Sequence, residues 1–335
     1  MILDGQSPQS IAAAAQALQR GELLGLPTET VYGLAADAGN DAAVAKIFEA
    51  KGRPANHPLI VHVASAQGVQ RFASHVPDFA QKLIDAFWPG PLTLILPRRP
   101  EVAAVAAGGQ NSVGLRCPSH PVAQAVLQSA EALGVFGVAA PSANFFGRVS
   151  PTTAAHVAGE FADDLLIIDG GACDVGIEST IVDCTRAAPV LLRPGVLTPE
   201  QLSQACGVLV AAPDKPEVDA PRASGTLESH YAPAAQVQLM TKVELQQALS
   251  QLGHGVGGVI AVWSRTPMSV PAAYADRVIW QSMPALPQDC AHELFAQLRD
   301  FDARGVNHIW VETPPLTSAW HGVRDRLTRA AAPSR

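Results

Sequence analysis

Two cations, Lys51 and Arg53, stand one residue apart in the stretch KGRPANHPLIVH, directly after a predicted helix. Lysine supplies a point charge and arginine a planar fork of N–H groups, a combination that suits a polyphosphate. Pro54 and Pro58 restrict the backbone of the loop, which is useful where side chains must be aimed. A solvated pair that complements a helix C-terminus is the alternative. The prolines favour an anion site.

A second polar group follows an apolar strand in the stretch AAPSANFFGRVS. Ser142, Asn144 and Ser150 offer neutral hydrogen-bonding groups, and their small neighbours let a ligand approach the backbone. The alternative is an ordinary turn into a helix, with Ser150 as the N-cap.

Two more groups of polar residues lie at strand ends. One predicted strand ends in the glycine-rich stretch DGGACDVGIEST, and the next strand begins with Ser179 and Thr180. A long hairpin loop is the alternative for this stretch. Arg116 and Arg193 end the stretches SVGLR and VLLRPG, where an arginine is often only a surface residue. Each signal is modest alone.

Together, the four loops offer cations, hydroxyls and glycines but no evident nucleophile. The chain has no GxSxG, no HExxH, no paired catalytic carboxylates and no cysteine beside a histidine base. His230, next to Tyr231 in SHYAP, is more typical of a contact than of a base. Such a site suits nucleotidyl or phosphoryl transfer, in which the protein positions reactants and neutralises charge.

Strands and helices interleave in the first part of the chain, and some neighbouring strands look antiparallel, so we expect an open, mixed α/β sheet. The predicted strands are Glu22–Leu26, Leu59–Val63, Leu92–Leu96, Ser112–Leu115, Val135–Ala140, Leu165–Ile168, Thr180–Val182 and Val190–Leu192. The predicted helices are Ile11–Arg20, Asp41–Ala50, Asp78–Phe87, Pro121–Leu133 and Thr152–Phe161.

Composition changes near Gly207, which divides the chain into residues 1–206, a proline-rich segment at 207–235 and residues 236–335. A structureless stretch of that length is a linker or a functional loop. After it, strands and helices alternate as in a small Rossmann-like α/β domain. The predicted strands are Val237–Met240, Gly258–Trp263, Val278–Met283 and His308–Thr313, and the helices Val243–Leu252, Asp289–Asp302 and Ser318–Ala330.

Length and charge exclude several classes of protein. The 335 residues suggest two domains, and 23 Lys+Arg against 30 Asp+Glu exclude a generic duplex-binding surface. Five widely spaced cysteines without a CxxC fit reduced thiols rather than disulfides or a zinc site. Because the chain shows neither a signal peptide nor a membrane span, we expect a soluble cytoplasmic protein.

Six stretches, in this order and spacing, resemble the YrdC-like threonylcarbamoyl-AMP synthases: LPTETVYGL, KGRPANHPLIVH, SVGLRCP, APSANFFGRVSPT, IEST and LLRPG. The linker ending in HYAP and the small α/β domain resemble the longer, two-domain form of the family, with a YrdC-like sheet first and the Rossmann-like domain second.

The resemblance implies a reaction of L-threonine, bicarbonate or CO2 and ATP that yields L-threonylcarbamoyl-AMP and pyrophosphate. A separate transferase complex would then use the product to modify an adenosine in tRNA. Five positions match those that hold threonine: Thr30, His62, Arg116, Ala140 and Ser179. Others match the ATP site: Lys51, Arg53, His57, Ser112, Ser142, Asn144, Ser150, Arg193, His230 and Tyr231. Lys51 and Arg53 would be catalytic.

Magnesium is expected to arrive with the ATP phosphates, since no side-chain metal ligands are evident. Two departures from the family pattern concern ATP contacts: His57 replaces the usual asparagine, and SGTLESHYAP lacks the usual basic residues of the linker. Arg222 could compensate for the missing cations.

Two other functions remain as alternatives. One is weak RNA binding through a basic groove, although the first 206 residues carry 12 Lys+Arg against 18 Asp+Glu. The other is a related carbamoyl transfer in hydrogenase maturation, whose enzymes carry acylphosphatase-like and zinc-finger modules that this chain lacks.

Overall fold

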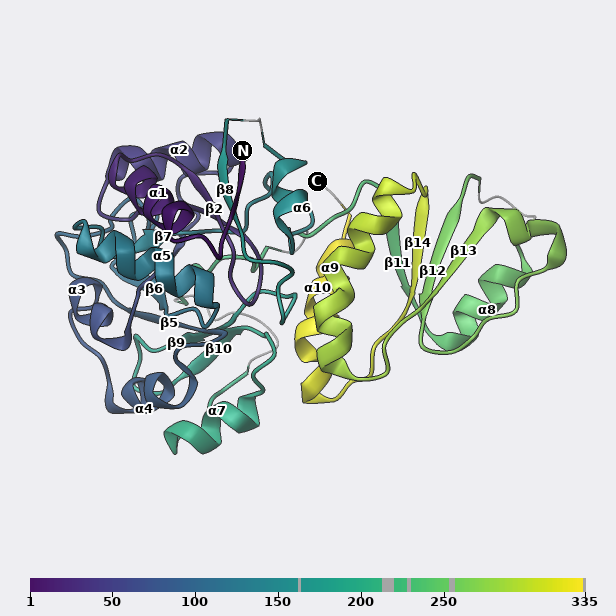
Figure 1. Cartoon of the computed structure of the whole chain (residues 1–335). Helices are drawn as coiled ribbons and strands as arrows, with labels where there is room; N and C mark the ends of the chain where they lie inside the picture. The colour runs from purple at the N-terminus through teal and green to yellow at the C-terminus, as the bar shows by residue number, and fades with distance from the viewer. Residues whose placement is uncertain (162–163, 213–219, 228–229, 253–256, 334–335) are drawn as a thin grey trace. The chain divides into compact units, whose positions relative to one another are not determined.

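The computed structural model describes residues 1–161, 164–212, 220–227, 230–252 and 257–333. They form two compact units: Met1–Phe146 with Ser150–Thr226, and Gly147–Val149 with Leu227–Arg335. Part of the predicted linker, at 213–219 and 228–229, lies outside the described residues. Each unit is described by itself (Figure 1).

The first unit is built on a ten-stranded sheet of order β1-β8-β2-β3-β7-β4-β6-β5-β9-β10. Five neighbouring pairs are antiparallel and four are parallel, so the sheet is mixed, as predicted. The strands are β1 (Ile2–Asp4), β2 (Leu24–Leu26), β3 (Gly33–Asp37), β4 (Ile60–His62), β5 (Leu92–Pro97), β6 (Ser112–Arg116), β7 (Val138–Ala139), β8 (Leu166–Asp169), β9 (Thr180–Asp183) and β10 (Val190–Arg193).

Helices cover both faces of this sheet, and most begin at a polar side chain that caps free N–H groups. Asn40, for example, accepts from the backbone N–H of Ala43 at the start of α2. The helices are α1 (Pro8–Gln19), α2 (Asp41–Lys51), η1 (Ala66–Gly68), α3 (Val69–Phe72), α4 (Asp78–Phe87), α5 (Pro121–Ala132), α6 (Ala154–Ala158) and α7 (Pro199–Cys206).

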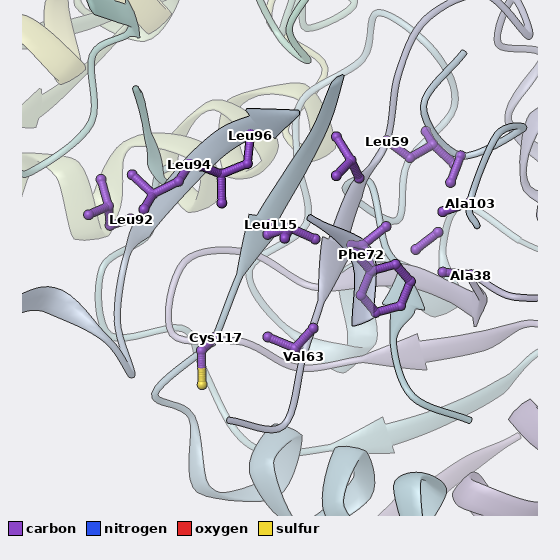
Figure 2. Packing of buried hydrophobic residues seen from close by; sticks show 14 of the residues in the cluster. Ala38, Leu59, Val63, Phe72, Leu92, Leu94, Leu96, Ala103, Leu115 and Cys117 are labelled. Carbon is purple, nitrogen blue, oxygen red and sulfur yellow. The ribbon is translucent and has the colours of Figure 1, made fainter. Parts of the chain in front are cut away.

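One face of the sheet packs against helices from β8 to β10 through the main core. Val61, Val113, Leu115, Leu94 and Val182 project from β4, β6, β5 and β9 into the main core. Figure 2 shows Leu92, Leu94 and Leu96 along β5, beside Leu115 of the next strand. Helices α2, α3 and α4 supply the other side of this core.

The opposite face is covered over only part of its width. Helices α1 and α5 lie side by side and pack on β2, β3 and β7, forming a second core. Over β4, β6, β5 and β9 the same face instead lines a pocket, closed on its far side by residues Arg222, Ala223 and Ser224. This face of β4, β6, β5 and β9 is therefore available for a binding site.

The second unit is a four-stranded, all-parallel sheet of order β11-β14-β12-β13, which agrees with the predicted Rossmann-like domain. Helix α8 packs on β12 and β14 through leucines, and α9 lies beside α10 (Figure 1). The elements are β11 (Gln236–Met240), α8 (Lys242–Ser250), β12 (Ile260–Ser264), η2 (Ala272–Arg277), β13 (Val278–Ser282), α9 (Pro287–Ala303), β14 (His308–Glu312), η3 (Ser318–Trp320) and α10 (His321–Ala331).

Some predicted elements need correction. The helix expected over Thr152–Phe161 is shorter, since α6 spans Ala154–Ala158. Strands β1 and β3 and helix α7 were not predicted. All five cysteines are buried and free of disulfides. No described helix is both long enough and apolar enough to span a membrane.

Candidate active site

Alternation along β4 and β6 brings three predicted site residues, His62, Ser112 and Arg116, to the uncovered half of the sheet. Successive side chains of a strand point to opposite faces. In β6, Val113 and Leu115 enter the core, and therefore Ser112 and Arg116 face the other way. His62 of β4 is paired in register with Arg116, so the two share that face. Residues far apart in the sequence thus lie on the same face of the sheet.

Arg116 is buried, which excludes the surface alternative, and protein groups contact each of its three nitrogens. Nε donates to the Gly90 carbonyl (3.2 Å) and Nη1 to the Thr30 hydroxyl (2.7 Å). Nη2 lies 2.7 Å from Oε1 of Glu29 in an ion pair whose side chains are 4% and 6% exposed. A guanidinium has five N–H groups, so these contacts hold it while leaving two for a ligand.

His62 is a neutral imidazole in this environment. Burial, followed by the charge of Arg116, lowers the pKa of His62 to about 3. Ala140, another residue predicted to hold threonine, is anchored beside β4 because its N–H donates to the Ile60 carbonyl at 3.0 Å. The predicted threonine residues Thr30, His62, Arg116 and Ala140 therefore gather around β4 and β6.

The pKa of His62 predicts how stability depends on pH. Below its ordinary pKa of 6.5, the unfolded chain takes up a proton on this histidine, whereas the folded protein does so only near pH 3. The stability present above pH 6.5 is lost as the pH falls toward 3. Between pH 7 and 5 we expect the free energy of unfolding to fall by on the order of 1–2 kcal/mol from His62 alone.

Urea unfolding of the wild type and of His62→Gln at pH 7 and 5 measures this effect. The variant should lose less stability between the two pH values. An equal loss in both proteins would mean that His62 is protonated as readily in the folded state as in the unfolded one.

Lys51 is also buried, with 2% of its surface exposed, so the solvated-pair alternative is wrong. It ends α2, where Gly52 adopts a left-handed conformation (φ 61°) and turns the chain toward Arg53. Its Nζ donates to the carbonyls of Ser142 (2.6 Å) and Asn144. An ammonium has three N–H groups, so one remains for a ligand.

The charge of Lys51 depends on what lies beside it. Burial, followed by the charge of Arg53, lowers the pKa of Lys51 well below its ordinary value, while Glu160 and Glu178 act in the opposite direction. An anionic ligand beside Nζ would raise this pKa and favour the charged form.

Arg53 and Arg193 are brought together by Ser224. Arg53 Nη2 donates to the Pro58 carbonyl (2.9 Å) and the Ser224 hydroxyl (3.3 Å), and Arg193 Nη1 donates to the Ser224 carbonyl (2.9 Å). Both arginines are buried. Ser224 therefore occupies N–H groups of two arginines that were predicted to bind phosphates.

An aromatic contact places His57 beside Arg53. The rings of His57 and Phe146 meet edge to face at 5.5 Å, and the Arg53 guanidinium lies 5.6 Å from the Phe146 ring centre. Burial, and then the charges of Arg53 and Arg222, lower the pKa of His57. Arg222 is anchored through Nη2 to the Gly108 carbonyl (3.0 Å).

Ser150 is not the N-cap of the following helix, because Thr153 fills that position. Its hydroxyl instead donates to Oε1 of Glu178 at 2.5 Å, and both side chains are buried. The hairpin alternative for the glycine-rich stretch is wrong too, since β8 and β9 are not neighbours in the sheet.

Ser179 joins the two groups of predicted residues. Its hydroxyl accepts from Arg193 Nη2 (3.2 Å) and lies 2.8 Å from the Thr93 hydroxyl. A side chain at Gly195 would come within 2.5 Å of the Thr180 nitrogen, so glycine lets the arginine loop approach β9. A residue predicted to hold threonine thus contacts one predicted to hold ATP.

His230 and Tyr231 belong to the second unit. The Tyr231 ring packs on Phe295 (5.3 Å), and the guanidinium of Arg326 lies 5.4 Å from the Tyr231 ring centre. Their expected contact with ATP stays a prediction.

Four residues of this site were missed by sequence reasoning: Glu29, Thr93, Glu178 and Ser224. Thr93 carries a readable signal, because it is a single polar side chain inside the apolar stretch LTLIL, whereas Glu29 stands between two threonines in PTET. Glu178 and Ser224 lie in polar stretches that offer no such contrast.

Comparison with known proteins shows which family the chain belongs to. A family model that covers Sua5, YciO and YrdC, described as telomere recombination, matches residues 16–195. A second model, described as the C-terminal domain of threonylcarbamoyl-AMP synthase, matches residues 197–332. A threonylcarbamoyl-AMP synthase from Pyrococcus abyssi is 38% identical over 96% of this chain and 94% of the relative. The chain belongs to the threonylcarbamoyl-AMP synthase family.

Other members extend the likeness over the full length. The threonylcarbamoyl-AMP synthase of Bacillus subtilis is 37% identical over 98% of this chain and 94% of its own. The crystal structure of P. abyssi Sua5 complexed with L-threonine has a TM-score of 0.87 at 35% identity, covering 99% of this chain and 97% of that one. A doubly substituted P. abyssi Sua5 gives 0.88 at 34% identity, with coverages of 99% and 96%. The chain is an enzyme of this threonylcarbamoyl-AMP synthase family with its two-domain fold.

Proposed function

We propose that the protein forms L-threonylcarbamoyl-AMP and pyrophosphate from L-threonine, bicarbonate or CO2, and ATP. One observation carries the proposal: the Ser179 hydroxyl of the amino-acid group accepts from Arg193 of the nucleotide group at 3.2 Å. Two substrates on neighbouring subsites would therefore meet. The P. abyssi Sua5 relative complexed with L-threonine supports the amino-acid assignment.

In this proposal the amino acid is held over β4 and β6. The two remaining N–H groups of Arg116 face the carboxylate of threonine, and Thr30, which already contacts Arg116, faces the polar groups of the amino acid. His62, Ala140 and Ser179 complete the subsite. A neutral His62 adds no second positive charge beside Arg116.

ATP occupies the cationic part of the site. The buried cations Lys51, Arg53 and Arg193 spread the charge of the phosphates. The other polar residues around the phosphates, ribose and base are His57, Ser112, Ser142, Asn144 and Ser150. Residues 207–235 serve as a lid that contributes His230 and Tyr231. The contacts of Ser224 with Arg53 and Arg193 support this role, since ATP would compete for the same N–H groups.

The chemistry requires no protein nucleophile. Threonine first loses an ammonium proton to solvent, and its neutral amine attacks CO2. A second proton leaves to solvent as the carbamate forms, and a carbamate oxygen then attacks the α-phosphorus of ATP as pyrophosphate leaves. The residues must hold both substrates in line, exclude water and stabilise the charge that develops on the phosphates. Lys51 and Arg53 are the proposed catalytic residues.

Magnesium enters with ATP as part of the substrate. Among the described residues, no three His, Cys, Asp or Glu side chains gather as a metal site. The phosphates would therefore supply most of the ligands, as is usual for magnesium with nucleotides.

We further propose a cytoplasmic enzyme whose product is consumed by a separate transferase that modifies tRNA. The division into a catalytic part at 1–206, a lid at 207–235 and a small domain at 236–335 belongs to the same proposal. Contact with tRNA would be weak or indirect, since the first part carries a net charge of about −6.

Omission of single substrates tests the reaction. The purified protein with ATP, L-threonine, bicarbonate and magnesium should release pyrophosphate and form a product with the mass of threonylcarbamoyl-AMP. Release should stop when threonine is left out, because the carbamate is the attacking group. Pyrophosphate release that continues without threonine would contradict the proposal.

A further inference from the structure

The amino-acid subsite contains buried polar atoms that the protein itself does not satisfy. Glu29 Oε2 and His62 Nδ1 are buried without a hydrogen-bond partner of good geometry among the described residues, and Glu29 Oε1 and Arg116 Nη2 meet in an ion pair at 2.7 Å that also lacks good hydrogen-bond geometry. Glu29, His62 and Arg116 are 4%, 3% and 3% exposed. Orphaned groups are costly inside a protein, and several together indicate a ligand that completes them.

The charges of this group nearly cancel. Glu29 carries one negative and Arg116 one positive charge, 2.7 Å apart, and His62 is neutral. Burial raises the pKa of Glu29, but the charge of Arg116 outweighs it together with nearby N–H groups, so the carboxylate stays ionised. A buried group of side chains with zero net charge does not favour a net anion or a net cation, because either would leave a buried charge uncompensated.

A zwitterion can satisfy both kinds of unpaired group, the acceptor oxygen of Glu29 and the donor N–H groups of Arg116. The Glu29 oxygen outside the ion pair, Oε2, has no hydrogen-bond donor of good geometry among the described residues, and an ammonium group supplies one. The remaining N–H groups of Arg116 are donors without an acceptor, which a carboxylate supplies. An amino acid carries both groups on one carbon atom, as the paired charges of the pocket require.

We propose that Glu29 is a specificity-determining residue: it faces the ammonium of the amino-acid substrate and, through its ion pair, positions Arg116 for the carboxylate. This inference rests on the proposed function and adds a residue to its amino-acid subsite. A purely structural ion pair would weaken every ligand alike when broken. Substitution of a residue that contacts the ammonium instead changes the ratio of the affinities for ligands with and without this group.

Binding of two matched probes to the full-length protein tests the proposal. L-Threonine carries the ammonium, and 3-hydroxybutyrate is a similar hydroxy acid without it. Titration calorimetry should show that the wild type binds threonine at least about tenfold more tightly. In Glu29→Gln, which keeps the shape and removes the charge, this ratio should fall at least about tenfold. Glu29→Asp, which keeps the charge, should preserve the preference even if both affinities fall.

Glu312→Gln is the matched control. Glu312 is another buried carboxylate, 2.8 Å from Arg265, but it lies in the second unit. Its substitution should leave the ratio of the two affinities unchanged. Thermal unfolding of each variant checks that it is folded.

Three outcomes would overturn the inference. One is an unchanged ratio in folded Glu29→Gln, and another is a change of similar size in Glu312→Gln. The third needs no variant: a wild type that binds both probes equally well does not read the ammonium. If the wild type makes the adenylate but shows any of these results, this inference fails while the proposed function stands; a wild type that makes no adenylate fails the proposed function instead.

Discussion

Lys51→Met is expected to reduce kcat by at least about 100-fold, since removal of one preorganised donor from developing charge typically has an effect of that size. The buried Nζ has one N–H left for the phosphates after it donates to the carbonyls of Ser142 and Asn144. Methionine keeps the bulk of the side chain in α2 but provides neither that donor nor the charge. Single-turnover formation of the adenylate with saturating ATP and threonine measures the loss.

Lys46→Met is the control for this substitution. Lys46 lies on the same helix and donates from Nζ to the Gly21 carbonyl at 2.7 Å, away from the site. Both variants lose a lysine that is anchored to the backbone, but only Lys51 is placed next to the predicted phosphates. Similar losses of kcat in the two variants would show that the effect comes from α2 rather than from the charge at the site.

Arg116→Met is expected to lower kcat/KM for threonine by at least about 100-fold and to destabilise the fold by roughly 3–5 kcal/mol. The value of kcat/KM falls because the threonine carboxylate loses its guanidinium partner. The fold is destabilised because Glu29 is left buried without its counter-ion. Urea unfolding and steady-state kinetics with varied threonine measure the two losses separately.

A double substitution separates these two roles of Arg116. In Arg116→Met with Glu29→Gln no buried charge is left unpaired, so most of the stability should return, because replacing a whole buried pair costs far less than breaking it. Activity should stay low. Recovered activity in the double variant would contradict the assignment of the Arg116 guanidinium to the threonine carboxylate.

Long, strongly patterned elements were predictable from the sequence, and weakly patterned ones were not. The apolar spacing of Asp78–Phe87 predicts α4 with its observed bounds. β3, with the sequence GLAAD, has residues of low strand propensity and becomes a strand because it pairs with β2 and β7. Helix α7 did have a readable start, the capping box that Thr198 forms with Gln201.

The site was predictable in its residue types but not in its pairings. Cations and hydroxyls at strand ends predicted one shared site; in the structure Arg193 donates to Ser179, and Arg116 is paired in register with His62 of the neighbouring strand. The pairing of Glu29 with Arg116 joins residues 87 positions apart, and no local pattern encodes which buried carboxylate meets which arginine. Such partners depend on the order of strands in the sheet.

Site and core residues alternate along the same strands, so an insertion or deletion in a strand affects both sets of residues at once. In β6, Leu115 enters the core and the next residue, Arg116, faces the pocket. Inserting or deleting one residue within this strand would exchange the two sets of side chains, sending a charge into the core and a leucine toward the substrate. Changes of length are therefore expected to accumulate in the loops between these strands, while the strands themselves change only by substitution.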